Sequence, residues 1–416
     1  LWKTCHEKKV MVYCINAQKL AYELGLGNRI NTIMQACFFL TSHYISFDKA
    51  EKGMRHALEE SYGKKGMDIV EKNLLALQKA AGHLKRVDIP DSLPAESLVK
   101  KNFSQNLFYD NVLQKVIDGE GDSLSVSCFP VDGTFPTATS KFEKRNIAYE
   151  IPIWDEKTCI QCGKCAFVCP HASIRIKVYE KQWLQNAPQS WKSLSAKDKE
   201  FSEMSYSIQV SPEDCTGCGI CVNVCPAKNK SETRRKALNM EHKYTYFENE
   251  KTYWNFFLQI PELDRKKIQN HKIRQQQIQE PLFEFSGACS GCGETPYVKL
   301  LSQLFGDRLL IANATGCSSI YGGNLPTTPW AKNKDGRGPA WANSLFEDNA
   351  EFGLGIYSAV QHQKENAISL LRSLSNKIGD NLANEIIAAS QTDDSEIEEQ
   401  RQRIVTLKNR LTNICQ

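Results

Sequence analysis

The sequence of 416 residues lacks three features that would each define a broad class of protein. It has no run approaching the roughly 18 apolar residues of a membrane-spanning helix, which argues against an integral membrane protein. Its formal net charge is only +4, which argues against a nucleic-acid binder that works by bulk charge. It also lacks an initiator methionine and the basic-then-apolar layout of a signal peptide. We therefore expect a chain that begins inside a longer protein, without a membrane or nucleic-acid partner.

What the sequence has in excess is cysteine, with 16 residues. A secreted disulfide scaffold is usually short and spreads its cysteines along its length. Here most of the cysteines stand in three tight groups, whereas the first 150 residues hold only four of them. Such clustering indicates metal binding in a reducing compartment, so we expect a cytoplasmic protein, and disulfides are the weaker alternative.

The pattern of apolar residues in the first part of the chain, residues 1–82, predicts alternating short strands and helices. A buried strand is expected over 9–15, and a helix over 16–24 that ends at two glycines. A longer helical stretch is expected over 49–77, with a break at 63–66 where two further glycines stand.

The composition and the apolar pattern of the sequence change twice in the rest of the chain. Residues 83–150 are rich in proline and turn residues, and predict loops around one helix over 107–117. From residue 285 an α/β pattern returns. The elements expected there are a helix over 296–305, a strand over 308–314, a loop over 321–342 and a helical C-terminal segment.

A lysine-rich stretch covers residues 228–280 and contains two short basic runs, 234–236 and 265–267. The main interpretation is a solvated face or a linker. The alternative is a docking surface for an acidic electron carrier, whose association would weaken as salt is added.

Eight cysteines form two copies of one motif with identical spacing. In each copy, two residues separate the first cysteine from the second and the second from the third. Three residues then separate the third cysteine from a fourth, which precedes proline. This spacing is typical of two-cluster ferredoxins, in which three thiolates of a motif bind one [4Fe–4S] cluster and the fourth binds the other. The expected ligand sets are Cys159, Cys162, Cys165 with Cys225, and Cys215, Cys218, Cys221 with Cys169.

Zinc is the alternative to iron and sulfide, because Cys-x2-Cys pairs also build zinc ribbons. Zinc needs only four ligands, usually as two pairs, so the third Cys-x2 step and the Cys-Pro would have no purpose. Two [4Fe–4S] clusters are therefore favoured. Residues 183–201, between the motifs, are expected to be an inserted surface element without chemistry of its own. Two neighbouring clusters without a substrate pocket would only conduct electrons. Another part of the protein must therefore supply those electrons.

A third group consists of Cys289, Cys292 and Cys317, in loops of small residues that precede expected helices. The aligned amides at a helix start favour the thiolate form of a cysteine, which suits a metal ligand. Three such cysteines could hold three corners of a further cluster. Two redox-inert structural loops are the alternative.

These residues are similar to the middle of the pyruvate:ferredoxin (flavodoxin) oxidoreductases, large enzymes that use thiamine diphosphate to split pyruvate with coenzyme A. The resemblance covers nearly the whole chain, and its last stretch is highly specific. It is carried by the cysteine octet and by residues 28–35, 62–66, 141–146, 285–296, 312–329 and 335–353.

The resemblance implies an α/β multidomain fragment. The implied parts are the α/β end of a coenzyme-A-contacting domain over 1–82, a small linking domain over 83–150, a two-cluster ferredoxin-like α+β domain over 151–240, a linker over 241–284, and the start of a thiamine-diphosphate-binding α/β domain over 285–416.

The resemblance also implies roles for cofactors and residues. In that family pyruvate adds to thiamine, loses carbon dioxide and releases single electrons through three [4Fe–4S] clusters. Coenzyme A takes the acetyl group, and ferredoxin or flavodoxin takes the electrons. Asn31 and Asn73 are implied as coenzyme A contacts, and both could equally be turn-forming residues. Glu294 and the backbone around Cys317 are implied as contacts to thiamine diphosphate, and the intact protein is implied to be a homodimer.

One motif of the family is missing from this sequence. The family binds Mg²⁺ and thiamine diphosphate through Gly-Asp-Gly, and this sequence has no such tripeptide. The fourth ligand of the third cluster is also expected elsewhere, because Cys415 lies in an expected packing helix. We therefore expect an interior fragment that binds clusters, carries no assigned catalytic residue and does not turn over pyruvate alone.

Two other classes of protein compete with this interpretation. A stand-alone carrier of polyferredoxin type would bind clusters without catalysis, and a zinc-stabilised structural protein would contain no iron. Residues 312–353 favour the enzyme, because a stand-alone electron carrier would not need a loop that faces a cofactor.

Overall fold

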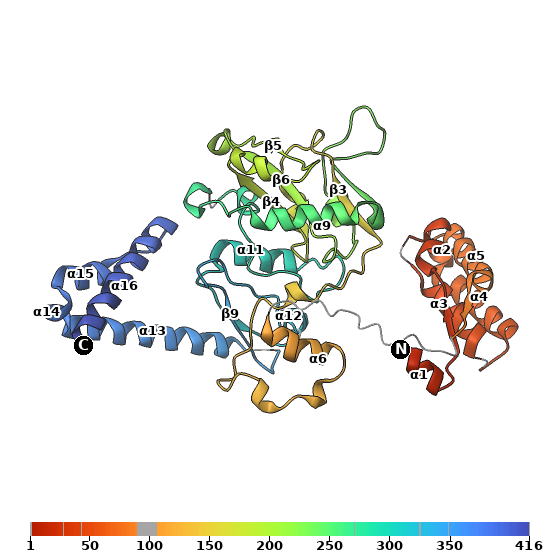
Figure 1. Cartoon of the computed structure of the whole chain (residues 1–416), viewed down its shortest axis with the longest axis horizontal. Helices are drawn as coiled ribbons and strands as arrows, with labels where there is room; N and C mark the ends of the chain where they lie inside the picture. Colours follow the sequence, from red (N-terminus) through yellow and green to blue (C-terminus); the bar gives the residue numbers. More distant parts are fainter. Residues whose placement is uncertain are drawn as a thin grey trace. The chain divides into compact units, whose positions relative to one another are not determined.

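The computed structural model describes residues 2–27, 29–42, 44–89, 106–269, 271–323, 326–347 and 349–415. The chain divides into two compact units, Leu1–Asn102 and Phe103–Gln416 (Figure 1). No helix in these described ranges is long and apolar enough to cross a lipid bilayer.

The first unit is mainly helical. Its helices are α1 (Trp2–Glu7), α2 (Ala17–Glu23), α3 (Asn31–Ser42), α4 (Phe47–Tyr62), the short η1 (Gly63–Lys65) and α5 (Met67–His83). Helices α3 and α4 pack on α5 around fully buried side chains such as Ile33 and Leu77. The predicted break at 63–66 is confirmed, since α4 ends at Tyr62 and Gly66 adopts a φ of 129° that favours glycine.

The buried strand expected over 9–15 is corrected by the structure. Strand β1 (Val12–Cys14) has three residues and pairs only with β2 (Lys85–Val87), in an antiparallel ribbon. Its residues are half-buried or exposed, because no second layer covers a two-stranded ribbon on both faces. An apolar run of this length was too short to distinguish a core strand from a ribbon.

The second unit begins with a loop-rich segment. Its elements are η2 (Tyr109–Leu113), α6 (Gln114–Ile117), η3 (Gly121–Ser123), η4 (Val126–Cys128) and η5 (Ser140–Phe142). The helix predicted over 107–117 is therefore present. The end of the segment is fixed to residues far along the chain, because Ala138 N donates to Trp330 O and Ser140 Oγ donates to Glu284 O.

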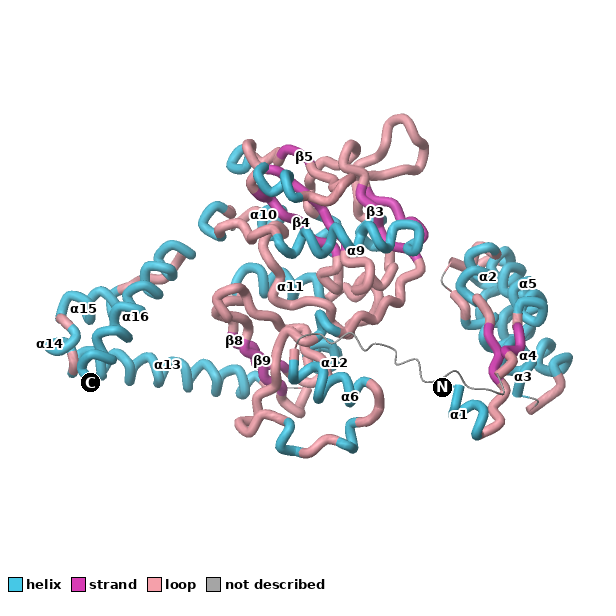
Figure 2. The backbone as a smooth tube through the Cα atoms, in the orientation of Figure 1, coloured by secondary structure: helices cyan, strands magenta, loops and turns pink. Residues whose placement is uncertain are grey.

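The part of the chain that contains the two cysteine motifs has short strands (Figure 2), which form antiparallel pairs. Strand β3 (Glu150–Trp154) pairs with β7 (Leu238–His242), and β4 (Ile174–Tyr179) pairs with β6 (Ser205–Val210), which also pairs with β5 (Leu194–Ser195). The short helices are α7 (Lys164–Val168), η6 (Lys181–Asn186), η7 (Lys199–Phe201) and α8 (Ile220–Asn223). One core, which includes Ile176, Ile208 and Leu238, packs directly against the cysteines.

The segment 241–284, expected to be a linker, is an ordered part of the second unit. This segment contains α9 (Lys243–Gln259), η8 (Arg265–Lys267) and α10 (Ile273–Gln276). Helix α9 packs against β6 and buries Trp254 and Phe257. Charged and amide residues stand between the aromatic residues of α9, so the segment is polar on average although this face is buried.

The C-terminal part begins with α11 (Thr295–Phe305), followed by β8 (Leu310–Asn313), α12 (Cys317–Gly322) and β9 (Ala340–Asn343), which pairs with β8 in parallel. The predicted helix and strand are therefore confirmed. The chain continues in α13 (Ala350–Ser373), α14 (Ser375–Ile378), α15 (Asp380–Ala388) and α16 (Asp394–Cys415).

Candidate metal centres

The first candidate centre is a cavity lined by Cys159, Cys162, Cys165 and Cys225. Three of these thiols belong to the first motif, and the fourth follows α8 in the second motif. The structure thus brings together the four cysteines that the sequence assigned to one cluster. The rest of the lining is mostly apolar, with Trp154, Ile160, Ile208, Leu238, Ala227 and Ala237.

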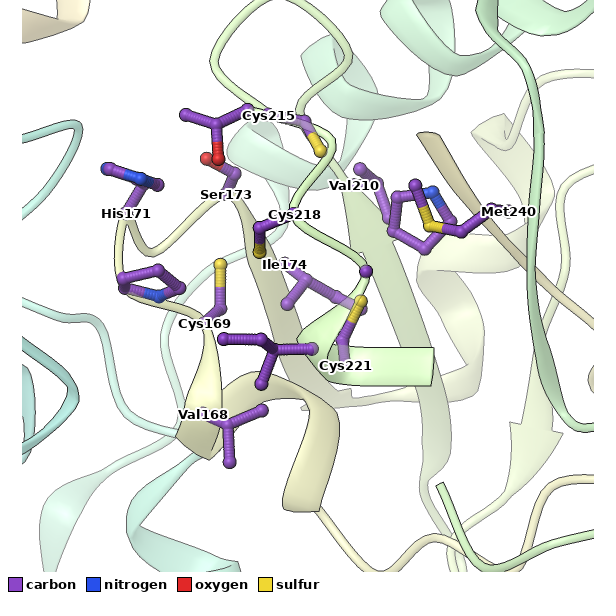
Figure 3. Close-up of a pocket in the computed structure, with 15 residues that line it drawn as sticks. Val168, Cys169, His171, Ser173, Ile174, Val210, Cys215, Cys218, Cys221 and Met240 are labelled. Atoms are coloured by element: carbon purple, nitrogen blue, oxygen red, sulfur yellow. The ribbon is translucent and has the colours of Figure 1, made fainter. Parts of the chain in front are cut away.

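The second candidate centre is a cavity lined by Cys215, Cys218, Cys221 and Cys169 (Figure 3). Here the exchange runs in the opposite direction, because Cys169 ends the first motif directly after α7. Among the apolar residues that complete this lining are Val168, Ile174, Val210 and Met240. The second predicted set is therefore also assembled around one space.

Both motifs adopt the same backbone path. The residue before the second cysteine is left-handed in each copy, with φ of 59° at Gln161 and 69° at Gly217. The residue after it is a left-handed glycine in each copy, with φ of 72° at Gly163 and 74° at Gly219. The backbone amides of Gln161 and Gly217 each donate a hydrogen bond to the sulfur of the first cysteine in their motif, at 3.4 Å. The turns therefore point these amides toward the cysteine sulfur atoms.

Three of these four left-handed positions are glycine, and the fourth is Gln161. The inserted segment 183–201 holds the Gln161 side chain in place. The Gln161 Nε2 donates to Ser195 O at 2.8 Å, and Lys197 N donates to the Gln161 Oε1 at 2.9 Å. Lys197 Nζ also donates to Cys159 O at 3.2 Å. The insertion was expected to be only a surface element, and the structure shows that it also fixes the loop of the first motif.

Burial controls the electrostatics of both cavities. Removal from water raises the pKa of Cys159, Cys165 and Cys221, and raises that of Cys215 to about 12. Neighbouring thiolates add to this effect in each case, because like charges repel. Four thiolates in such a cavity therefore need a positively charged group between them, which the irons of a cluster supply.

The donor sets fit [4Fe–4S] clusters in number, chemistry and arrangement. Among the described residues, no three thiols, imidazoles or carboxylates converge on one point as ligands of a single metal ion do. The thiols instead line cavities, in sets of four with amide hydrogen bonds to sulfur, and this arrangement suits a group of several atoms. The fifteen cysteines whose side chains are described are all free, and Cys415 lies outside them.

The third group lies beside the second motif. Ser290 Oγ donates to Thr216 Oγ1 at 3.3 Å, and a Cβ added to Gly291 would lie 3.8 Å from the Cβ of Cys218. The imidazole of His171, which follows Cys169 and Pro170, donates from Nδ1 to Ser286 O at 3.1 Å. The loop of Cys289 and Cys292 is thus packed directly on the second centre.

Tyr321, on α12, is influenced by Glu294, Cys292 and Cys317. It was not among the residues predicted from the sequence. Burial raises the pKa of its hydroxyl, and the adjacent carboxylate of Glu294 and the thiols of Cys292 and Cys317 raise it further. These three predicted residues therefore all act on the electrostatics of one phenol. The available signal was spacing, because Tyr321 stands four residues after Cys317 on the same face of α12.

Glu143, Lys144 and Arg145, within the stretch 141–146, join the second motif to the C-terminal part. Lys144 Nζ lies 2.6 Å from the buried Asp214 carboxylate, which directly precedes Cys215. Thr327 Oγ1 donates to the Glu143 carboxylate at 2.8 Å, and Arg145 pairs with the same carboxylate at 3.1 Å. The triplet therefore holds two distant segments against one another.

The two predicted coenzyme A contacts lie in the first unit. Asn31 is exposed at the start of α3, and Asn73 is buried within α5, so neither is in a turn. The Asn73 amide donates to Ile69 O at 2.9 Å and accepts from Thr32 Oγ1 at 2.7 Å. Both ends of the Asn73 side chain are thus bonded within the unit, and the contact to coenzyme A stays a prediction.

Comparisons with known proteins agree with this geometry. Residues 158–229 match a 4Fe-4S dicluster domain, which supports the prediction of two clusters in this segment. Residues 3–82 match the family described as pyruvate ferredoxin/flavodoxin oxidoreductase, and residues 95–148 match a domain of unknown function. The pyruvate-flavodoxin oxidoreductase of Nostoc is 54% identical over 98% of this chain. The chain is homologous to part of the pyruvate-flavodoxin oxidoreductases.

Other relatives carry similar names. A probable pyruvate-flavodoxin oxidoreductase of Escherichia coli is 46% identical over 99% of the chain. A pyruvate:ferredoxin oxidoreductase of Moorella thermoacetica is 44% identical over 89%. The chain spans 35% of the length of the Nostoc and Escherichia coli relatives and 31% of the Moorella relative.

Proposed function

We propose that this chain is the electron-transfer core of an oxidoreductase that converts pyruvate and coenzyme A to acetyl-coenzyme A and carbon dioxide, with flavodoxin or ferredoxin as the electron acceptor. The observation that carries the proposal is the pair of four-thiol cavities with exchanged fourth cysteines. A [4Fe–4S] cluster in each cavity would accept and release single electrons.

The order of the ligand sets in space supports a chain of redox centres. The third group touches the second motif through Gly291. The second centre is joined to the first through α7, because Cys165 lies within this helix, Cys169 directly follows it, and the two belong to different sets. Cys289, Cys292 and Cys317 would hold a third cluster together with a ligand from the rest of the protein, next to thiamine diphosphate with Mg²⁺ at Glu294. The alternative of a stand-alone carrier does not use these residues.

Anaerobic reconstitution tests the proposal directly. We expect the 416-residue chain to bind roughly eight irons and eight sulfides, because two complete ligand sets each hold a four-iron cluster. Iron beyond that amount would report on the third group. The measurements are iron and labile sulfide analysis with visible and EPR spectra of the reduced protein. Colourless protein that contains zinc and no sulfide would contradict the proposal and support the structural alternative.

We further propose that the electron acceptor docks on the basic loop, defined as residues 228–236. The loop is an extension of the first centre, because Ala227 and Ala237 at its base are hydrogen-bonded to each other and line that cavity. Lys228, Lys230 and Arg234 are exposed, and none of the ion pairs found among the described residues involves them. An acidic carrier would meet an unneutralised positive surface beside the nearest cluster.

Charge reversal of the basic loop is expected to slow electron transfer to an acidic flavodoxin. Changing Lys228, Lys230 and Arg234 together to glutamate should lower the second-order rate constant at least about tenfold at low salt, because electrostatic steering of this size is common. The rates of variant and parent should converge as salt rises, since screening removes the difference. Stopped-flow oxidation of the reduced clusters measures this.

A matched variant controls for net charge. Lys364, Lys377 and Lys408 are exposed lysines on α13, α14 and α16, and their change to glutamate alters the total charge equally. Equal slowing in both triple variants would show that overall charge, and not this loop, governs the association.

A further inference from the structure

Lys299, in the middle of α11, is a buried cation with only carbonyl oxygens around it. The residue is 3% exposed, although lysine is almost never buried without a partner. Its Nζ donates to the carbonyls of Ala166 and Phe167 and, at 3.4 Å, to that of Cys169. Among the described residues it forms no ion pair with a carboxylate.

Two other buried cations, both on β4, differ in this respect. Arg175 pairs with Glu284, and Lys177 lies 2.7 Å from the Glu262 carboxylate. Their charges are therefore neutralised within the protein. A buried ammonium without such a partner carries a desolvation cost that three neutral carbonyls offset only in part. Another negative group is needed nearby.

The position of Lys299 indicates which negative groups these are. The carbonyls that it contacts belong to the end of α7 and to Cys169. Cys165, within α7, lines the first centre, and Cys169 lines the second, so the ammonium lies at the segment shared by both. A [4Fe–4S] cluster with four thiolates carries net negative charge, and reduction adds one more negative charge. A fixed cation at this place stabilises the reduced form of each.

We propose that Lys299 is the shared counter-charge of the two clusters and raises the reduction potential of both. This inference rests on the proposed function, since it requires both clusters. Lys299 is a positioning and tuning residue and not a catalytic one. Because α11 begins three residues after Cys292, the same side chain also ties the third group to the ferredoxin-type motifs.

The test is a redox titration of the reconstituted chain, followed by EPR of the reduced clusters. Lys299→Met and Lys299→Gln remove the charge, and the glutamine retains an N–H donor for the α7 carbonyls. Both should shift the reduction equilibrium of each cluster at least tenfold toward the oxidised form, which is about 59 mV for one electron. Lys299→Arg retains the charge and should titrate close to the parent.

Lys177→Met is the matched control, because it removes a buried lysine whose charge Glu262 already neutralises. Its potentials should stay near those of the parent, although its stability falls. If Lys299→Gln binds both clusters and their reduction potentials equal those of the parent, Lys299 is only a helix cap and the proposal is wrong.

The remaining outcomes also decide the question. If neither neutral variant holds clusters while Lys299→Arg holds them at the parent potential, the positive charge is required for assembly and the proposal stands. If the arginine variant fails as well, the role of Lys299 is packing and the proposal fails. A parent chain without iron–sulfur signals would overturn the proposed function itself, and is recognised before any variant is compared.

Discussion

Replacing Cys169 with alanine is expected to remove the cluster of the second motif and to leave the cluster of the first motif in place. The reason is the exchange of fourth ligands, since Cys169 lines the cavity of Cys215, Cys218 and Cys221. A cluster left with three protein thiolates should be lost on purification, so the iron content should fall from roughly eight to roughly four. Iron and sulfide analysis with EPR of the reduced protein measures the loss.

Double variants identify which cluster is lost. Cys169→Ala combined with Cys215→Ala should lose no more iron than Cys169→Ala alone, because both residues serve one cluster and their effects do not add. Cys169→Ala combined with Cys225→Ala should lose both clusters. The reverse pattern would show that each motif binds its own fourth cysteine. Cys128→Ala is the control, because this exposed cysteine lies outside every group.

The grouping of the eight cysteines into two sets of four could be predicted from sequence because it depends on local geometry. Spacings of two residues with left-handed turns at Gly163 and Gly219 are properties of the chain itself. The short helix between the third and the fourth cysteine carries the fourth one away from its own motif. The structure therefore assembles both sets of four cysteines that the spacing predicted.

Contacts between distant residues could not be predicted in this way. Lys144 and Asp214 are 70 positions apart, and Lys299 meets Ala166 across 133 positions. No periodic pattern in the sequence marks either pair, because the two members of each pair meet only in the folded chain. For the same reason the insertion gave no sign that Ser195 and Lys197 hold Gln161.

Burial was misjudged where charge and apolar surface share one element. The segment 241–284 was expected to be a linker because the stretch 228–280 is polar and contains several lysines. Trp254 and Phe257, about one helical turn apart on α9, are buried, and the helix packs against β6. Average composition does not show this arrangement, whereas the helical spacing of these aromatic residues could have shown it.

The junction between the ferredoxin-type motifs and the third group depends on Arg175. Its side chain pairs with the Glu284 carboxylate, and both side chains are about nine-tenths buried. The guanidinium also lies 5.3 Å from the ring of Trp254 and 5.2 Å from that of Phe285. Phe285 has a left-handed φ of 51°, so the contacts hold a strained residue just before the Cys289 loop.

Arg175→Ala is therefore expected to destabilise the chain by about 3–5 kcal/mol, because it leaves Glu284 buried without a partner. The melting temperature of the reconstituted protein should fall on the order of 10 °C. Arg235→Ala is the matched control: its pairs with Glu232 and Glu241 are half-exposed, so its cost should stay within about 1 kcal/mol.

A compensating change separates lost charge pairing from lost packing. Arg175→Met with Glu284→Leu replaces the pair by apolar side chains of similar size, which is often neutral or stabilising for a buried ion pair. The double variant should regain most of the lost stability, because neither charge remains unpaired. If it is no more stable than Arg175→Ala, the aromatic contacts of the guanidinium, and not its pairing with Glu284, hold the third group against the ferredoxin-type motifs.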